Sequence, residues 1–201
     1  MRDFALKEAI DAPVESAETN DTAEANDALD GVSDAPVLTD TERVEIIQEL
    51  LKESDINNAE KWEKLTAIER AKILKDLGDE IAAKTGLDKI PISFRDDMAA
   101  NVLGSYDTIR RNININISQI ADAEARLDAA ETLCHELRHA FQQQAMLNPE
   151  KYGISQELAD EWRYNFDNYK TVEMFGYRAY YEQALERDAF AHGEQCRRVL
   201  E

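Results

Sequence analysis

The chain lacks any long apolar run. No stretch approaches the roughly 20 consecutive apolar residues that a membrane span requires, so we expect no membrane contact. Its first residues, MRDFALKEAIDAP, also lack the basic region and apolar run of a secretory signal. We therefore expect a cytoplasmic protein. Its 201 residues suffice for one domain, or for one domain and a tail.

Basic residues and cysteines are scarce as well. The chain has 23 Lys and Arg against 42 Asp and Glu, a formal net charge of −19. Phosphate contacts need an excess of basic side chains, so this balance argues against a nucleic-acid-binding surface. The two cysteines, Cys134 and Cys196, are too few for a disulfide framework.

Acidic residues are concentrated near the N-terminus. Residues 1–40 hold eleven Asp and Glu, two basic residues and few large apolar ones. Such a composition cannot bury enough apolar surface to offset the entropy cost of ordering. We predict a disordered acidic tail over residues 1–38 and a folded domain over residues 39–201. The tail could bind a basic partner, although acidic tails more often only solubilise a protein.

Helical signals dominate the folded part. Thr39 with Glu42, and Thr66 with Glu69, have the spacing of capping boxes, and each pair precedes an apolar stripe of helical period. Gly86 follows the second stripe, where a glycine commonly ends a helix. These patterns predict two packing helices before residue 86.

The period then changes to that of strands. IPISF at 90–94 reads as a short strand, and residues 112–117 alternate Asn with Ile as a half-buried strand does. Residues 104–111 fit a preceding strand and turn, which would give a small antiparallel or mixed sheet. From about Asp122 the helical period returns, so we predict an α+β fold with a mostly helical C-terminal half.

Two of the three histidines lie in the segment LCHELRHAFQ, residues 133–142. At about 100° per residue, His135 and His139 share one helix face, and Glu136 lies beside that face. Histidines at this spacing can share a zinc ion, while the glutamate takes a proton from a zinc-activated water. Chance would place about 0.005 such motifs in a chain of this composition. The alternative is a helix with two exposed histidines.

The rest of this helix shows how it would pack. Leu137, Phe141 and Cys134 lie at about 200–260° from His135, so they form an apolar back that we expect to pack on the sheet. Cys134 could serve as a thiolate ligand, but its direction favours a buried structural thiol. Arg138, at about 300°, would point to solvent or to a carboxylate.

A catalytic zinc site needs a third protein ligand and an open position. The extended metzincin motif would require Gly at 142 and His at 145, but the chain has Gln142 and Ala145. A ligand from a later helix is the other common arrangement. The segment 180–193 offers four candidates, among which the residue pattern does not choose: Glu182, Glu186, Asp188 and His192.

A family resemblance narrows this choice. HELRHAFQ, preceded by GSYD and NININ and followed by ERDA, resembles small gluzincin-type metallopeptidases of bacteria, phages and mobile elements, and more distantly the ImmA/IrrE-type peptidases. The resemblance covers about residues 65–193. It implies a zincin-like fold, one zinc ion and a protein or peptide substrate. It also implies Glu186 as the third ligand and Asp188 as a carboxylate that supports the ligands.

Two further roles follow from the resemblance to zincins. An edge strand usually binds the substrate backbone, and residues 111–118 are the candidate by position. A hydrogen-bond donor is expected for the developing oxyanion. Tyr169, Tyr177, Tyr180 and Tyr181 are available, and of these Tyr177 and Tyr181 are the candidates. The expected function is zinc-dependent peptide-bond hydrolysis by a metalloendopeptidase. The alternative is a non-catalytic, zinc-stabilised binding module whose site is closed by a fourth ligand such as Cys134 or His192.

Overall fold

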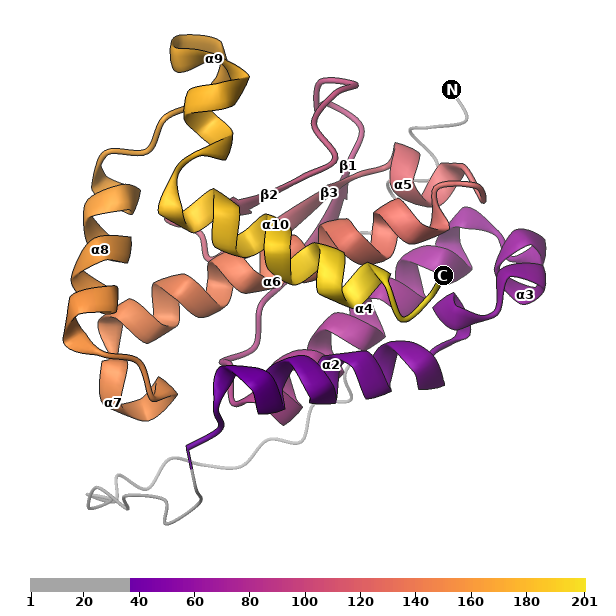
Figure 1. Cartoon of the computed structure of the whole chain (residues 1–201). Coiled ribbons are helices and arrows are strands. Elements are labelled where there is room, and N and C mark those ends of the chain that lie inside the picture. The colour runs from indigo at the N-terminus through magenta and orange to yellow at the C-terminus, as the bar shows by residue number, and fades with distance from the viewer. Residues whose placement is uncertain (1–36) are drawn as a thin grey trace, which may run out of the picture.

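A computed structural model describes residues 37–201 of the protein (Figure 1). Residues 1–36, most of the predicted acidic tail, lie outside the described residues. The described part is a mostly helical α+β fold with one small mixed sheet, as the sequence predicts. None of its helices is both long enough and apolar enough to cross a membrane.

The elements follow one another in a simple order. The N-terminal helices precede the strands, and the remaining helices follow them. The bounds are α2 (Asp40–Glu53), η1 (Asp55–Asn57), α3 (Ala59–Lys64), α4 (Ala67–Thr85), β1 (Ile92–Arg95), β2 (Gly104–Asp107), β3 (Asn112–Asn116), α5 (Ser118–Ala121), α6 (Arg126–Leu147), α7 (Pro149–Tyr152), α8 (Gln156–Asp167), α9 (Val172–Tyr181) and α10 (Ala184–Arg197).

Both predicted capping boxes form. The Thr39 hydroxyl accepts a hydrogen bond from the Glu42 N–H at 3.2 Å, and Thr66 accepts one from Glu69 at 3.3 Å. Gly86 ends α4 with a φ of 78°, in the left-handed region that favours glycine. These hydrogen bonds confirm both predictions. The sequence could predict them because capping depends on residues only three positions apart.

The sheet has the strand order β1-β3-β2. β3 runs antiparallel to β2 and parallel to β1. Ile113 and Ile115 of β3 are fully buried, as their alternation predicts. The turn before β3 is closed by Asp107, whose carboxylate accepts hydrogen bonds from the N–H groups of Ile109 and Arg110 at 2.9 and 2.8 Å.

One prediction about the sheet is wrong. Residues 111–118 contain β3, which is the middle strand and pairs on both sides, so it cannot accept a further strand. The edge strands are β1 and β2, and β2 packs against α6. β3 is central because β1 pairs with it in parallel, a contact that no local pattern reveals.

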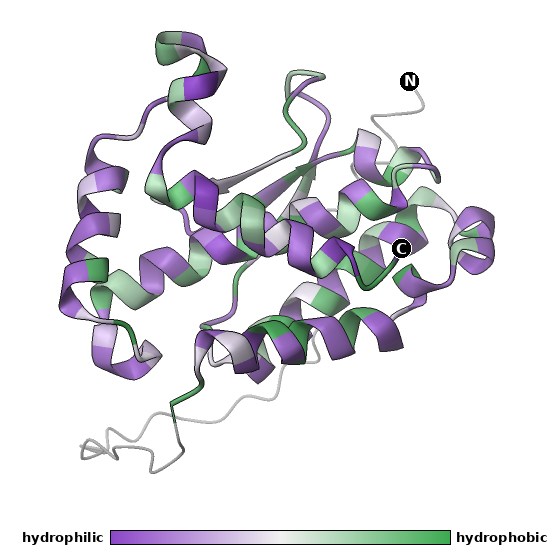
Figure 2. Ribbon diagram, viewed as in Figure 1, coloured by the Kyte–Doolittle hydropathy of each residue, from purple (hydrophilic) through white to green (hydrophobic). Residues whose placement is uncertain are grey.

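Helix α6 lies at the centre of the fold. It runs between the sheet and α10, while α8 lies beside its C-terminal half (Figure 1). Nearly every side chain from Ala129 to Ala145 is buried. Along α2, by contrast, apolar and polar residues alternate in Figure 2, as expected for a helix that buries one side. The central helix therefore carries its polar motif inside the protein.

Candidate metal centre

The two motif histidines are buried on α6. His135 is 8% exposed and His139 7%, so the alternative of a helix with two exposed histidines is wrong. Helix α10 passes closely beside them. A Cβ atom added at Gly193 of α10 would lie 3.2 Å from the Glu131 carbonyl oxygen and 3.6 Å from the His135 Cβ. The glycine thus allows the close packing that brings α10 to the motif.

Glu186 of α10 reaches both histidines. Its two carboxylate oxygens lie 3.4 Å from His135 Nε2 and 3.3 Å from His139 Nε2. The two Nε2 atoms are themselves 3.1 Å apart. Of the four residues that the sequence left open, Glu186 is the one that joins His135 and His139 in a cluster able to hold a metal ion.

These separations fit a metal ion. Tetrahedral ligands at about 2.0–2.1 Å from zinc have their donor atoms about 3.3 Å apart. The three observed separations lie close to that value. In addition, Oε2 of Glu186 is buried without a hydrogen-bond partner, which is costly unless a cation compensates it. The donor set therefore suits one metal ion, and zinc is among the ions that histidine and carboxylate ligands select.

Electrostatics at the cluster also favour a positive charge. Burial opposes protonation of His139, but the hydrogen bond and negative charge of Glu186 outweigh it and raise the pKa of His139 to about 9. Burial likewise opposes ionisation of Glu186, yet its contacts with His135 and His139 hold the pKa of this carboxyl well below its usual range. A cation among these three side chains is thus stabilised by the protein.

No family model matches the chain, and neither the curated proteins nor the solved structures contain a match.

Glu136 belongs to α6 and lies beside the cluster. Its side chain faces β2 at Gly104. Burial, which penalises the charged form, raises the pKa of this carboxyl, while His135 and His139 act in the opposite direction. The Tyr106 N–H contacts one oxygen, and Oε2 has no hydrogen-bond partner. A buried carboxyl with a raised pKa and a free oxygen is suited to accept a proton and release it again.

The sheet contacts α6 on an unexpected side. The apolar side of Leu137 and Cys134 predicts that the sheet lies behind the motif. Instead β2 packs against the side that carries Glu136, and the hydroxyl of Tyr106 donates to Gln143 Oε1 at 2.6 Å. The amide of Gln143 in turn donates to the Thr108 carbonyl at 2.9 Å. β2 is thereby fixed next to Glu136.

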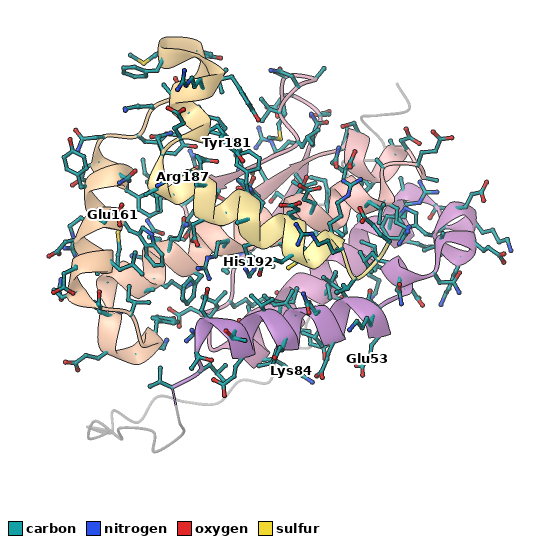
Figure 3. The ribbon with its side chains drawn as sticks, in the orientation of Figure 1. Glu53, Lys84, Glu161, Tyr181, Arg187 and His192 are labelled. Carbon is teal, nitrogen blue, oxygen red and sulfur yellow. The ribbon has the colours of Figure 1, made fainter. Side chains whose placement is uncertain are left out.

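The predicted fourth ligands lie elsewhere. Cys134 is fully buried, as expected, and its thiol contacts Cys196 on α10. His192 contacts the same Cys196 thiol. It also lines a small cavity with Arg43 and Ile47 of α2, and Figure 3 shows it halfway along α10. Among the described residues, only His135, His139 and Glu186 form a metal-ligand cluster.

Asp188 supports the cluster indirectly. The Nδ1 atom of His139 lies 2.8 Å from Gln142 Oε1, and Gln142 Nε2 donates to Asp188 Oδ2 at 2.7 Å. The predicted contact of Asp188 with a ligand therefore runs through Gln142. The role of Gln142 could have been found from the sequence, because Gln142 follows His139 by three positions and so shares its helix face.

Of the four tyrosines available from the sequence, the structure places Tyr169 and Tyr180 at Glu186, the predicted third ligand. The hydroxyl of Tyr169 donates to Glu186 Oε1, and Tyr180 also contacts this carboxylate. Tyr177 and Tyr181, the candidates from the sequence, stack on each other with ring centres 6.0 Å apart. Figure 3 shows Tyr181 where α9 meets α10. Their role as oxyanion donors stays a prediction.

Tyr181 nevertheless adjoins the centre through one aromatic ring. Its ring lies 5.1 Å from that of Phe190, which lies 4.6 Å from the imidazole of His135. The two tyrosines themselves are exposed to solvent, and 63% of Tyr177 is accessible. An aromatic surface thus leads from the solvent to His135, one of the histidines that could hold a metal ion.

Proposed function

We propose that residues 39–201 form a zincin-like metallopeptidase domain of the gluzincin type. The observation that carries the proposal is the arrangement of four side chains. His135, His139 and Glu186 present donor atoms at separations suited to zinc, and Glu136 lies beside them with a free buried oxygen. The resemblance to gluzincin-type and ImmA/IrrE-type peptidases supports the same function.

In the proposed reaction the zinc ion and Glu136 have separate roles. A zinc ion held by His135, His139 and Glu186 would supply Lewis acidity, acidifying a water and polarising the substrate carbonyl. Glu136 accepts a proton from the attacking water and delivers it to the leaving amine. Its raised pKa suits both transfers, because the carboxyl must take up the proton and then release it.

The substrate is proposed to be an extended polypeptide that adds to the edge of the sheet. Among the described residues β2 pairs only with β3, and the Tyr106 N–H on its other edge contacts Glu136, so an added strand would take the place of that contact. β2 also packs beside Glu136, which would bring an added peptide bond near the proton acceptor. This assigns to β2 the role that the sequence suggested for residues 111–118.

Among residues 37–201, the non-catalytic alternative finds no fourth protein ligand beside His135, His139 and Glu186. A structural zinc site takes four protein ligands. Cys134 and His192, the residues considered for that position, both contact Cys196 instead of the cluster. An open fourth position is what a hydrolytic site requires, and this favours the peptidase.

Metal reconstitution tests the proposal. We expect full-length protein stripped with a chelator to take up one zinc ion per chain and to cleave a fluorescently labelled unfolded protein only after zinc is restored. Zinc at about 100 times its dissociation constant should raise the free energy of unfolding by about 2.7 kcal/mol. Elemental analysis and thermal unfolding measure both effects.

Two results would contradict the proposal. Stoichiometric iron in place of zinc would point to oxygen chemistry, because two histidines and a carboxylate also form iron sites. Zinc uptake without cleavage of any peptide in a mixed library would favour the zinc-stabilised binding module.

Gly104→Ala tests the contact between β2 and Glu136. The added Cβ would lie 2.6 Å from Thr132 Cγ2 and 2.9 Å from Glu136 Oε1, so both side chains must shift. We expect a loss of about 1–3 kcal/mol in unfolding free energy, typical of overpacking. Cleavage should fall while zinc affinity changes little, because neither histidine is displaced. Ser105→Ala, at the exposed neighbouring position, is the control. Equal stability and equal cleavage rates in Gly104→Ala and Ser105→Ala would refute the contact between β2 and Glu136.

A further inference from the structure

Arg138 is a buried cation inside the motif. Its side chain is only 6% exposed, and its guanidinium lies 4.7 Å above the ring of Phe141. The sequence expectation was solvent or a carboxylate, and the structure supplies two carboxylates. Nε and Nη2 donate to both oxygens of Asp188 at 2.7 and 2.9 Å. Asp40, the first residue of α2, accepts from Nη1 and, at 3.2 Å, from Nη2.

Asp188 in turn orients Gln142. The amide nitrogen of Gln142 donates to Asp188 Oδ2 at 2.7 Å and to the Leu185 carbonyl at 3.0 Å. Both partners are acceptors, so this end of the amide must be the NH₂ group. The oxygen of Gln142 therefore faces His139, and the residue is fully buried, which leaves it little freedom to turn.

The orientation of Gln142 selects the tautomer of His139. An amide oxygen only accepts, so Nδ1 of His139 must carry the hydrogen across the 2.8 Å contact. In neutral imidazole Nε2 then has the lone pair, and Nε2 is the atom that faces His135 and Glu186. A chain of contacts thus links the exposed start of α2 to a metal-binding atom.

We propose that Asp40 is a positioning residue for the metal centre. It acts on His139 through Arg138, Asp188 and Gln142, so the first turn of α2 sets the metal affinity of a site on α6 and α10. Asp40 is 98 positions before Arg138 and its side chain is 58% exposed, so the control point is accessible at the surface. The inference rests on the metal centre of the proposed function, but not on peptidase activity.

Zinc titration of the full-length protein against a chromophoric chelator tests this role. Loss of an outer partner of a metal ligand typically weakens binding by about 10–100-fold, and we expect this range for Gln142→Leu. Asp40→Asn, three contacts further out, should weaken zinc binding by about three-fold, since Asp188 still holds Arg138. Glu42→Gln is the matched control, because it removes a charge from the same first turn but contacts Thr39 instead of Arg138. It should bind zinc as the wild type does.

A double-mutant cycle separates positioning from a general loss of stability. Thermal unfolding without metal measures stability in every variant. In an Arg138→Lys background, which keeps the charge but loses the paired hydrogen bonds, Asp40→Asn should cause no further loss of zinc affinity. Arg138→Lys itself should resemble Gln142→Leu in affinity. If it does not fold, the comparison of Asp40→Asn with Glu42→Gln still decides the matter.

The outcomes distinguish this inference from the proposed function. Equal zinc affinities for Asp40→Asn and the wild type, or an equal fall in Glu42→Gln, would overturn the role of Asp40 and leave the metal centre intact. Zinc binding that depends on Asp40 in a protein without peptidase activity would support the inference and contradict the proposed reaction. A wild type that binds no zinc would overturn both.

Discussion

Glu136→Gln is expected to reduce peptide cleavage by about a thousand-fold, within the range of a lost general base, while one zinc ion stays bound. Glutamine has the shape of glutamate but cannot accept the proton of the attacking water. His135, His139 and Glu186 are unchanged, so the donor atoms keep their separations. Initial cleavage rates and elemental analysis of the same preparation measure the two effects.

Glu131→Gln supplies the comparison. It removes one carboxylate from the same helix, five positions before Glu136. Glu131 pairs with Arg197 at 2.8 Å and does not belong to the cluster that could hold a metal ion. We expect cleavage close to that of the wild type. Wild-type cleavage by Glu136→Gln would exclude the proposed proton transfer. A simultaneous loss of zinc would instead show that Glu136 supports the ligands.

The helices, the strands and the pairing of the two motif histidines could be predicted from the sequence, because they depend on residues only a few positions apart in the chain. Capping at Thr39 and Thr66 involves residues three positions apart, and burial of Ile113 and Ile115 follows from a period of two. The shared direction of His135 and His139 is likewise set by the helical period. In each case one local geometry determines which side chains meet.

The sheet order could not be predicted in the same way. A strand pattern shows which residues face inward, but not which neighbours the strand has. β3 became central through its parallel pairing with β1, across an intervening loop and β2. The position of β2 beside Glu136 then depends on contacts such as that between Tyr106 and Gln143. These are tertiary contacts with no local signature.

The outer parts of the candidate site were missed for a related reason. Arg138 does meet carboxylates, one of the two predicted alternatives, but the residue pattern does not identify them, because they lie 98 positions before it and 50 positions after it. Tyr169 meets Glu186 because the segment between α8 and α9 passes over the carboxylate. Only the packed fold brings such residues together. Even Glu186 came from a family resemblance, since its helix offers several equivalent carboxylates.

Glu186→Gln is expected to weaken zinc binding by more than the roughly 100-fold that an outer partner can cost, and to abolish cleavage. The change keeps the size of the side chain but removes the charge that lies 3.3 and 3.4 Å from the two Nε2 atoms. Tyr169 can still donate to the amide oxygen, so the surrounding packing is retained. Chelator competition gives the affinity, and circular dichroism checks the fold.

Glu182→Gln is the matched variant, because Glu182 precedes Glu186 by four positions and was an equal candidate on sequence grounds. In the structure it is exposed and pairs with Arg178 at 2.7 Å. An exposed ion pair contributes little to stability, so we expect unchanged zinc affinity and cleavage. The reverse result, zinc retained in Glu186→Gln and lost in Glu182→Gln, would refute the ligand set. Glu182 is exposed and Glu186 is buried, so unfolding without metal is measured for both variants. A fall in zinc affinity at unchanged stability is then assigned to contact with the metal.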